Sequence, residues 1–303
     1  SPDMPEFEVV IRFGRYPVSK RAAQAIESLR PAQIVVDVQE SRDFNAQTTT
    51  FVAANPLDFV VALLEAVSYN LDEMPDEQSH LPLNIQEWGM LDRDRSERIL
   101  ASNLAEDDSF EGAYVQALLQ EIPAESLLFS ANSMAIRAVD EFYFTRGKRL
   151  TVLANRGLNG IDGTVSSALG AAQEFKQTVF LTGDLTFLHD MNALALQEEM
   201  LLQEKEGMHR PSIVIVLLNN QGGAIFDMLP QQSKEAYFER LFLTPQHVDF
   251  CAVAQAFGVP ATKVATVEDF RRALTKNFEV PGISLVEVTV PLQGVKERYG
   301  RYR

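Results

Sequence analysis

Short apolar runs that alternate with longer amphipathic segments constrain the fold of this chain more than any other feature. In the second half of the chain these runs fall at residues 127–129, 150–154, 178–181, 213–218 and 283–290. They are rich in Val, Ile and Leu at consecutive positions, which is typical of parallel strands buried on both faces. The segments between them have the apolar spacing of helices. The alternation therefore predicts an α/β fold, a doubly wound parallel sheet, over residues 109–303.

The first half of the chain shows the same alternation, but it soon breaks off. Strands are expected at residues 8–13 and 33–38, and helices at residues 19–29, where Ser19 is the cap, and 57–69. Residues 70–83 then combine acidic residues with two prolines, which is the composition of a linker. We predict the end of a central α/β domain at residues 1–75, a linker with a charged surface helix at residues 76–108, and the doubly wound domain after it.

The amino-acid composition excludes several classes of binding partner for this chain. Lys and Arg number 27 against 42 Asp and Glu, which gives a net charge of −15. Such a chain does not attract nucleic acid or anionic lipid, and it has no run of basic residues that would do so locally. No apolar run is long enough for a membrane span, and the N-terminus has no signal-peptide pattern. Cys251, the single cysteine, excludes an internal disulfide and suits a reducing compartment, so we expect a cytoplasmic protein.

Polar residues follow two neighbouring strands at the edge where an open parallel sheet binds its ligands. Gly-Asp-Leu at residues 183–185 follows one strand, and Asn-Asn-Gln-Gly-Gly at residues 219–223 follows the next. A carboxylate, an amide oxygen and a backbone carbonyl make half of an octahedral Mg²⁺ shell, and diphosphate oxygens and water would complete it. The alternative is that Asp184 only caps a helix and that residues 219–223 form a polar turn.

These two motifs together resemble the signature of thiamin diphosphate (ThDP) enzymes. Five segments are similar to one branch of them, the 2-succinyl-5-enolpyruvyl-6-hydroxy-3-cyclohexene-1-carboxylate (SEPHCHC) synthase family of menaquinone and phylloquinone biosynthesis. These segments are GDLTFLHDMNALAL (183–196), NNQGGAIFDMLP (219–230), NRGLNGIDG (155–163), ANSMAIR (131–137) and FGRYPVSKR (13–21). The resemblance extends over the whole chain.

The resemblance implies a reaction and its cofactors. Enzymes of this family use ThDP and Mg²⁺ to decarboxylate 2-oxoglutarate. They then add the succinyl carbanion to isochorismate in a 1,4 sense to give SEPHCHC. Their sites form between subunits, so the resemblance also implies a homodimer or homotetramer.

The resemblance also implies roles for individual residues. Asp184, Asn220 and the carbonyl of Gly222 are the implied Mg²⁺ ligands, and Ile161 is the apolar residue that bends the cofactor. The implied cofactor contacts are Asn132, Gly160, Ile161, Gly183, Asp184, Leu185, Asn220, Gly222, Gly223 and Ile225. The implied catalytic residues are Ser133, Arg137, Arg156, Ile225 and Phe226. The implied substrate-binding residues are Lys20, Arg21, Ser133, Arg137 and Arg156.

The chemistry of the arginines agrees with this assignment. Both substrates carry two carboxylates, and the planar guanidinium of Arg binds a carboxylate through two parallel hydrogen bonds. Arg137 follows Ser133 by one helical turn, so both should point the same way from the start of one helix. Arg156 directly follows a strand and precedes a glycine-rich loop. The competing interpretation of each arginine is a solvated surface charge.

Two departures and two alternatives remain open. The interval between Gly183 and Asn220 is longer than in the family, with the excess placed at residues 197–211. No segment resembles the N-terminal domain that supplies the activating Glu, so we expect the diphosphate half of the site and an inactive isolated chain.

One alternative is another ThDP-dependent 2-oxoacid decarboxylase or carboligase. The other is a non-catalytic nucleotide-binding or structural domain, because the glycines of residues 157–163 precede a helix, although without G-x-G-x-x-G spacing.

Three further features receive no catalytic role. The four histidines lack metal-ligand spacing, and Cys251 lies on an apolar helix where a packing role is expected. The basic aromatic tail at residues 299–303 is expected to be a disordered end.

Overall fold

The computed structural model describes residues 7–40, 43, 45–71, 83–144, 147–205, 211–233 and 235–302. The chain divides into two compact units, Ser1–Glu97 and Arg98–Arg303, and the division falls inside helix α3 (Leu83–Leu100). Most of the predicted linker at residues 70–83, with His80, lies outside the described residues, and so does His209. None of the helices described is both long and apolar enough to cross a membrane.

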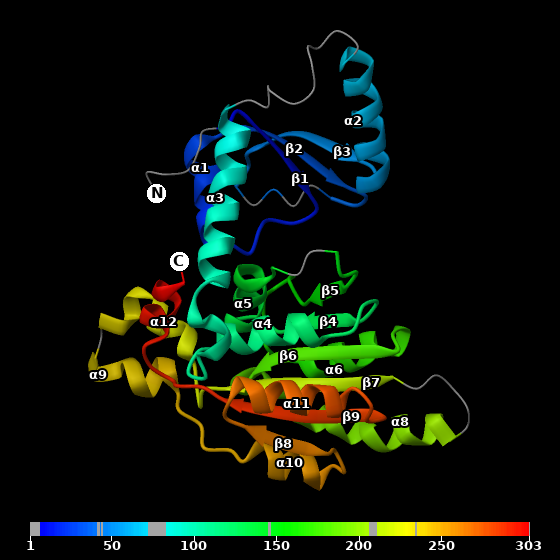
Figure 1. The fold of residues 1–303 in the computed structure, drawn as a ribbon, viewed down its shortest axis with the longest axis vertical. Coiled ribbons are helices and arrows are strands. Elements are labelled where there is room, and N and C mark those ends of the chain that lie inside the picture. Colours follow the sequence, from blue (N-terminus) through cyan, green and yellow to red (C-terminus); the bar gives the residue numbers. More distant parts are fainter. Residues whose placement is uncertain are drawn as a thin grey trace. The chain divides into compact units, whose positions relative to one another are not determined.

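Unit 1 contains a small parallel sheet (Figure 1). Its strands lie in the order β1 (Val9–Phe13), β2 (Ala32–Asp37) and β3 (Thr48–Ala53), and its helices are α1 (Lys20–Leu29), α2 (Pro56–Leu71) and most of α3. Ser19 caps α1 as predicted, because its hydroxyl accepts a hydrogen bond from the Ala22 N–H. The sequence analysis missed β3. This strand opens with three threonines, which are β-branched but polar, so no apolar run marks it.

Unit 2 contains a six-stranded sheet in which every pairing is parallel. The strand order, which can be followed in Figure 1 from the green β5 to the orange β8, is β5 (Thr151–Ala154), β4 (Leu127–Ser130), β6 (Gln177–Gly183), β7 (Ser212–Asn219), β9 (Gly282–Thr289) and β8 (Ala261–Val264). Phe129, Phe180, Ile215 and Leu285 form one buried row across four neighbouring strands. The predicted doubly wound parallel sheet is confirmed.

Helices cover both faces of this sheet. The chain passes from β4 to β5 in one direction along the sheet and from β5 to β6 in the other, so right-handed crossovers place the intervening helices on opposite faces. One face carries α4 (Glu111–Glu121), α5 (Met134–Phe142) and α11 (Val267–Asn277), which contact one another through α4. The other face carries α6 (Thr164–Ala171), α7 (Asp184–Asp190) and α10 (Phe250–Ala256), the last two joined by Phe187 and Phe250. The remaining helices are α8 (Leu196–Lys205), α9 (Glu235–Phe238) and α12 (Val295–Arg301).

Two expectations about unit 2 were wrong in detail. Strand β5 lies at the sheet edge, so Val152 and Leu153 are about two-fifths exposed and the strand is not buried on both faces. The segment between β6 and β7, which the sequence analysis expects to be helical, is not one continuous helix, because a 3₁₀ turn at Met191–Ala195 separates α7 from α8.

The C-terminal segment is packed, which contradicts the expectation of a disordered end for residues 299–302. Tyr299 is fully buried, and its ring contacts Phe110 and Phe142 with centroids 5.0 and 6.0 Å away. Tyr302 stacks on Phe110 and donates its hydroxyl to Asp107 at 2.9 Å. Aromatic partners distant in the chain, Phe110 and Phe142, therefore hold α12 against the rest of unit 2.

We predict that Asp107→Asn weakens unit 2 at neutral pH and flattens its response to acid. Burial alone would raise the pKa of Asp107, but hydrogen bonds from Ser109 and Tyr302 and the charge of Arg301 outweigh it and lower the pKa. A lowered pKa stabilises the fold above the unfolded value of about 3.9, and this stabilisation is lost as the pH falls through the folded pKa. The variant should be about 1 kcal/mol less stable at neutral pH. Melting temperatures should fall less steeply with acid in the variant, and a parallel fall in both proteins would contradict the prediction.

Candidate functional site

A cavity of about 210 Å³ lies in unit 2 where β4, β6 and β7 end. Its walls come from residues 132–135 after β4, Ile161 in the loop after β5, residues 183–186 after β6 and the turn after β7. Glu111, the first residue of α4, completes the wall. This is the carboxyl edge of the sheet, where open α/β sheets bind ligands.

Asp184 and the turn after β7 meet at one backbone N–H. The Asp184 side chain is almost fully buried, and its Oδ2 accepts a hydrogen bond from the Gly222 N–H at 2.7 Å. The Oδ1 atom of Asn220 accepts from the same N–H at 3.1 Å. The two side-chain oxygens therefore lie no farther apart than the sum of these distances, and their residues directly follow the neighbouring strands β6 and β7. Asp184 Oδ1 also accepts from the Leu185 N–H at 2.8 Å, so this carboxylate serves the start of α7 as well.

Two glycines let the turn pack against another backbone segment. A Cβ atom on Gly222 would collide with the carbonyl oxygen of Leu243, and one on Gly223 would lie 2.5 Å from that of Phe242. The Gly223 N–H instead donates to the Leu243 carbonyl at 2.6 Å. Glycine is therefore required at both positions, because the neighbouring backbone leaves no space for a side chain.

A hydrogen bond to Glu287, on the neighbouring strand β9, also stabilises the turn. Asn219 donates to Glu287 Oε1 at 2.9 Å, and its own Oδ1 accepts from the Gln221 N–H at 2.9 Å. Lys263 lies 2.9 Å from the same Glu287 oxygen, and the Cys251 thiol donates to the other. Burial and the neighbouring Glu287 carboxylate raise the pKa of Cys251 to about 12. This cysteine therefore stays a protonated structural thiol.

Asn132 organises the loop between β5 and α6. Its amide nitrogen donates to the carbonyls of Asn155, at 3.0 Å, and Gly160, at 2.7 Å, while its oxygen accepts from Arg156 at 2.8 Å. Gly160 precedes Ile161, which lines the cavity. The far end of the loop is fixed separately.

Asp190 fixes that far end. Its two carboxylate oxygens accept from the N–H and the hydroxyl of Ser166, at 2.7 and 3.0 Å, near the start of α6. The N-cap of α6 is Gly163, which has no side chain to bond the first N–H groups, so Asp190 substitutes for a cap from α7.

We predict that Asn132→Asp disorders the glycine-rich loop. A carboxylate keeps the shape and can still accept from Arg156, but it cannot donate to the carbonyls of Asn155 and Gly160 and would repel them. The two lost hydrogen bonds should lower stability by about 2–3 kcal/mol. Hydrogen exchange of the amides of residues 155–163 should accelerate in the variant more than exchange in β6 and β7, and uniform acceleration would contradict a local role.

Ser133 adopts an unusual backbone conformation at the cavity wall. Its φ and ψ are 64° and −129°, a region that residues with a side chain rarely occupy. Such strain persists only where surrounding structure enforces it, and it is common at functional sites. Arg137, one turn later on α5, donates to the Ser133 carbonyl at 2.6 Å.

The structure brings together most of the residues expected at the site. The expected residues that line the cavity are Asn132, Ser133, Ile161, Gly183, Asp184, Leu185, Asn220, Gly222, Gly223, Ile225 and Phe226. Arg137, Arg156 and Gly160 lie one contact behind this wall, through the hydrogen bonds described above. Lys20 and Arg21 are exposed at the start of α1 in unit 1.

Burial raises the pKa values of the two acids that line the cavity, Asp184 and Glu111. It raises the pKa of Asp184 to about 6 against the opposing effect of backbone hydrogen bonds, and it also raises the pKa of Glu111. Within the described part of the chain, no three His, Cys, Asp or Glu side chains cluster as metal ligands. A cation here would be bound by one carboxylate, neutral oxygens and the ligand's own anionic oxygens, a donor set that suits Mg²⁺.

The sequence analysis missed four buried acids around the site: Glu111, Asp190, Asp227 and Glu287. Glu287 is a charged residue between the apolar Val286 and Val288 of β9, and that pattern could have signalled a buried, partnered carboxylate. The other three carry no such signal, because their partners are distant in the sequence.

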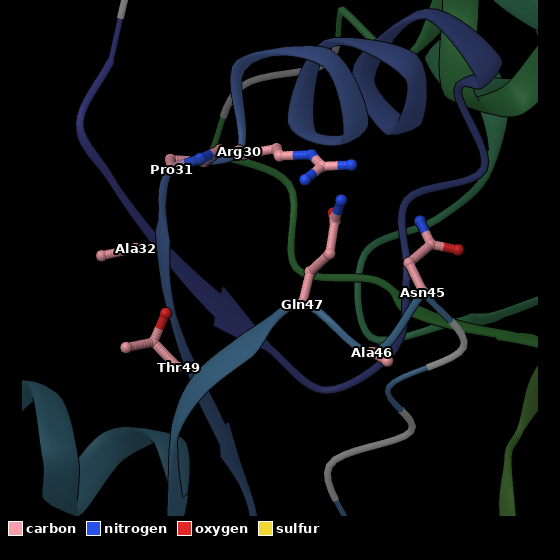
Figure 2. Close-up of a pocket in the computed structure, with 7 residues that line it drawn as sticks. All are labelled: Arg30, Pro31, Ala32, Asn45, Ala46, Gln47 and Thr49. Atoms are coloured by element: carbon pink, nitrogen blue, oxygen red, sulfur yellow. The ribbon is translucent and has the colours of Figure 1, made fainter.

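A second cavity, of about 340 Å³, lies in unit 1 and has different chemistry. Its lining is Arg30, Pro31, Ala32, Asn45, Ala46, Gln47 and Thr49, and Figure 2 shows the Arg30 and Gln47 side chains pointing toward each other. None of these lining residues is an acid, so this cavity offers no counterpart to the carboxylate of Asp184 in unit 2.

A family profile matches the part of the chain that carries most of the cavity wall. The family is described as "Thiamine pyrophosphate enzyme, C-terminal TPP binding domain", and the match covers residues 137–288. This is half of the chain and includes both Asp184 and the turn after β7.

The chain is also similar to curated proteins named 2-succinyl-5-enolpyruvyl-6-hydroxy-3-cyclohexene-1-carboxylate synthase. It is 36% identical to the protein of Oceanobacillus iheyensis over 284 residues, which are 93% of this chain and 46% of that protein. It is 37% identical to the protein of Desulfitobacterium hafniense over 302 residues, 98% and 50% of the two chains. The chain spans about half the length of the curated relatives it matches.

Proposed function

Because the chain belongs to the thiamine pyrophosphate enzymes through their C-terminal TPP-binding domain, we propose that its cavity binds the diphosphate end of this cofactor, ThDP. Mg²⁺ would join the diphosphate to Asp184, Asn220 and the carbonyl of Gly222. One observation carries the proposal: the oxygens of Asp184 and Asn220 converge on a single N–H at the carboxyl edge of the sheet. A cation bound beside these oxygens would neutralise the buried carboxylate and offset the field of a chain with net charge −15.

The remaining cavity residues suit the rest of the cofactor. Ile161 would support it from below, on a loop that Asn132 holds at Gly160. Ile225 and Phe226 contribute an apolar wall that excludes water from the reacting end. The bound cofactor supplies the electron sink that decarboxylation of a 2-oxoacid requires.

We further propose that the whole protein is a SEPHCHC synthase of menaquinone biosynthesis. It would decarboxylate 2-oxoglutarate and add the succinyl unit to isochorismate in a 1,4 sense. The names of its relatives and the nearby arginines support this proposal. Arg137 and Arg156 lie directly behind the cavity wall, from which a guanidinium could orient a substrate carboxylate. Ser133, Lys20 and Arg21 would assist in substrate binding. A homodimer or homotetramer would complete the site.

Calorimetric titration of the chain with ThDP tests the cofactor assignment. We expect binding in the presence of Mg²⁺ and loss of binding after EDTA removes the metal. A nucleotide-binding domain would instead respond to ATP or NAD and ignore ThDP. Binding that is indifferent to Mg²⁺ would contradict the proposed metal bridge.

Release of CO₂ tests the substrates. It is measured with the chain joined to the N-terminal half that its relatives carry, together with ThDP, Mg²⁺ and a panel of 2-oxoacids. We expect 2-oxoglutarate to be preferred over pyruvate and turnover to depend on isochorismate. Preference for pyruvate would favour another ThDP-dependent decarboxylase or carboligase.

A further inference from the structure

Glu111 is a buried acid in the cavity wall for which the proposed function has no role. Only 2% of its surface is exposed, yet it lines the same cavity as Asp184 and Gly222. One carboxyl oxygen, Oε1, accepts a hydrogen bond from the Tyr299 hydroxyl at 3.1 Å. A carboxyl enclosed in this way is costly to bury unless its polar atoms have partners. Tyr299 supplies one partner, and the cavity is where a second could bind.

Tyr299 belongs to the C-terminal helix, which is also bonded to a second segment of the cavity wall. The Val295 N–H at the start of α12 donates to Asp227 at 2.8 Å. Asp227 lies in the 3₁₀ turn Ala224–Met228, which also contains the cavity residues Ile225 and Phe226. Helix α12 thus bonds to two walls of one cavity, although it lies beyond the family match that ends at residue 288.

The charge state of Glu111 suits an anionic ligand. Burial raises its pKa, and the opposing effects of the Tyr299 hydroxyl and the buried Arg298 do not cancel this. A protonated carboxyl has an O–H to donate and adds no negative charge opposite a diphosphate.

We propose that Glu111 is a ligand-binding residue of this cavity, donating a hydrogen bond to the diphosphate-bearing ligand, and that Tyr299 positions it. The inference rests on the proposed function and extends it to two residues outside the known motif segments. It makes α12 a part of the cofactor site, because its tyrosine holds one oxygen of Glu111 and leaves the other for the ligand.

Titration of the chain with ThDP at saturating Mg²⁺ tests this assignment in four variants. Glu111→Gln keeps the shape and a neutral donor, so affinity should stay within about threefold of the natural chain. Glu111→Leu has a similar volume and no hydrogen-bonding group, so affinity should fall roughly tenfold to a hundredfold. Tyr299→Phe should weaken binding by about threefold to tenfold. Tyr114→Phe is the matched control, since Tyr114 is buried on α4 but donates to the carbonyls of Asp108 and Ala265, away from the cavity.

A double-mutant cycle separates positioning from general destabilisation. If Tyr299 acts through Glu111, Tyr299→Phe should cause no further loss of affinity when Glu111 is already Leu. Full additivity, or natural affinity in Glu111→Leu, would overturn the inference while leaving the proposed function intact. Equal losses in Glu111→Gln and Glu111→Leu would overturn the neutral-donor role. Failure of the unsubstituted chain to bind ThDP would overturn the proposed function, and this inference with it.

Discussion

Asp184→Asn should abolish Mg²⁺-dependent binding of ThDP, with a loss of affinity of at least about a hundredfold. The substitution removes the one charged ligand in the proposed metal site, and the remaining donors, Asn220 and the Gly222 carbonyl, are neutral. Calorimetry with and without Mg²⁺ measures the loss. Unchanged affinity would mean that the metal is held elsewhere or is not used.

The same variant should fold at least as well as the natural chain, which makes the result interpretable. Asn keeps the shape of Asp184. Its side-chain oxygen can still accept the hydrogen bond from the Gly222 N–H, which is 2.7 Å long in the natural chain. Burial raises the pKa of Asp184 to about 6, so in the absence of metal its stabilising contribution is lost as the pH rises through that value. Because Asn does not ionise, the variant does not lose stability in this way. Its melting temperature at neutral pH should therefore be no lower than that of the natural chain. A large drop in melting temperature would indicate misfolding instead.

Gly222→Ala should damage both the fold and the site. The new methyl group would collide with the Leu243 carbonyl oxygen, which is backbone and cannot rotate away. Either the turn or residues 242–243 must shift, at a cost of about 1–3 kcal/mol. The shift would move Asn220 and the Gly222 carbonyl relative to Asp184, so ThDP affinity should fall at least about tenfold.

Gly170→Ala is the matched control for this prediction. Gly170 lies in α6, and nothing lies within 4 Å of the position its Cβ would occupy. Alanine favours a helix more than glycine does, so this variant should gain up to about 1 kcal/mol of stability and keep its affinity for ThDP. Similar losses in both variants would show that the effect at Gly222 is not steric.

Several parts of the fold could be predicted from the sequence because they depend on local patterns. Runs of Val, Ile and Leu mark β6 and β7 wherever the rest of the chain lies, and Ser19 marks the start of α1. Strand β3 escaped detection because its threonines give no apolar run. Helix α12 was missed because its polar tail resembles a solvated end, whereas Tyr299 is buried by partners distant in the sequence, among them Phe110 and Phe142.

The candidate site divides in the same way. Gly183 and Asp184 after β6, and the Asn-Asn turn after β7, could be located because parallel topology alone brings adjacent strand ends to one edge. Their convergence on a single N–H required coordinates, since it depends on how the Gly222–Gly223 backbone packs against residues 242–243.

The sequence by itself determined the α/β architecture of this protein, the edge of the sheet where its chemistry lies and the side-chain types gathered there. Only the tertiary structure decided which acids are buried and what each one contacts. Glu111 meets Tyr299 across 188 positions of sequence, and Asp227 meets Val295 across 68. The reason is physical: a strand or helix follows from the preferences of neighbouring residues, whereas the burial and charge of one carboxyl depend on whatever the whole fold places around it.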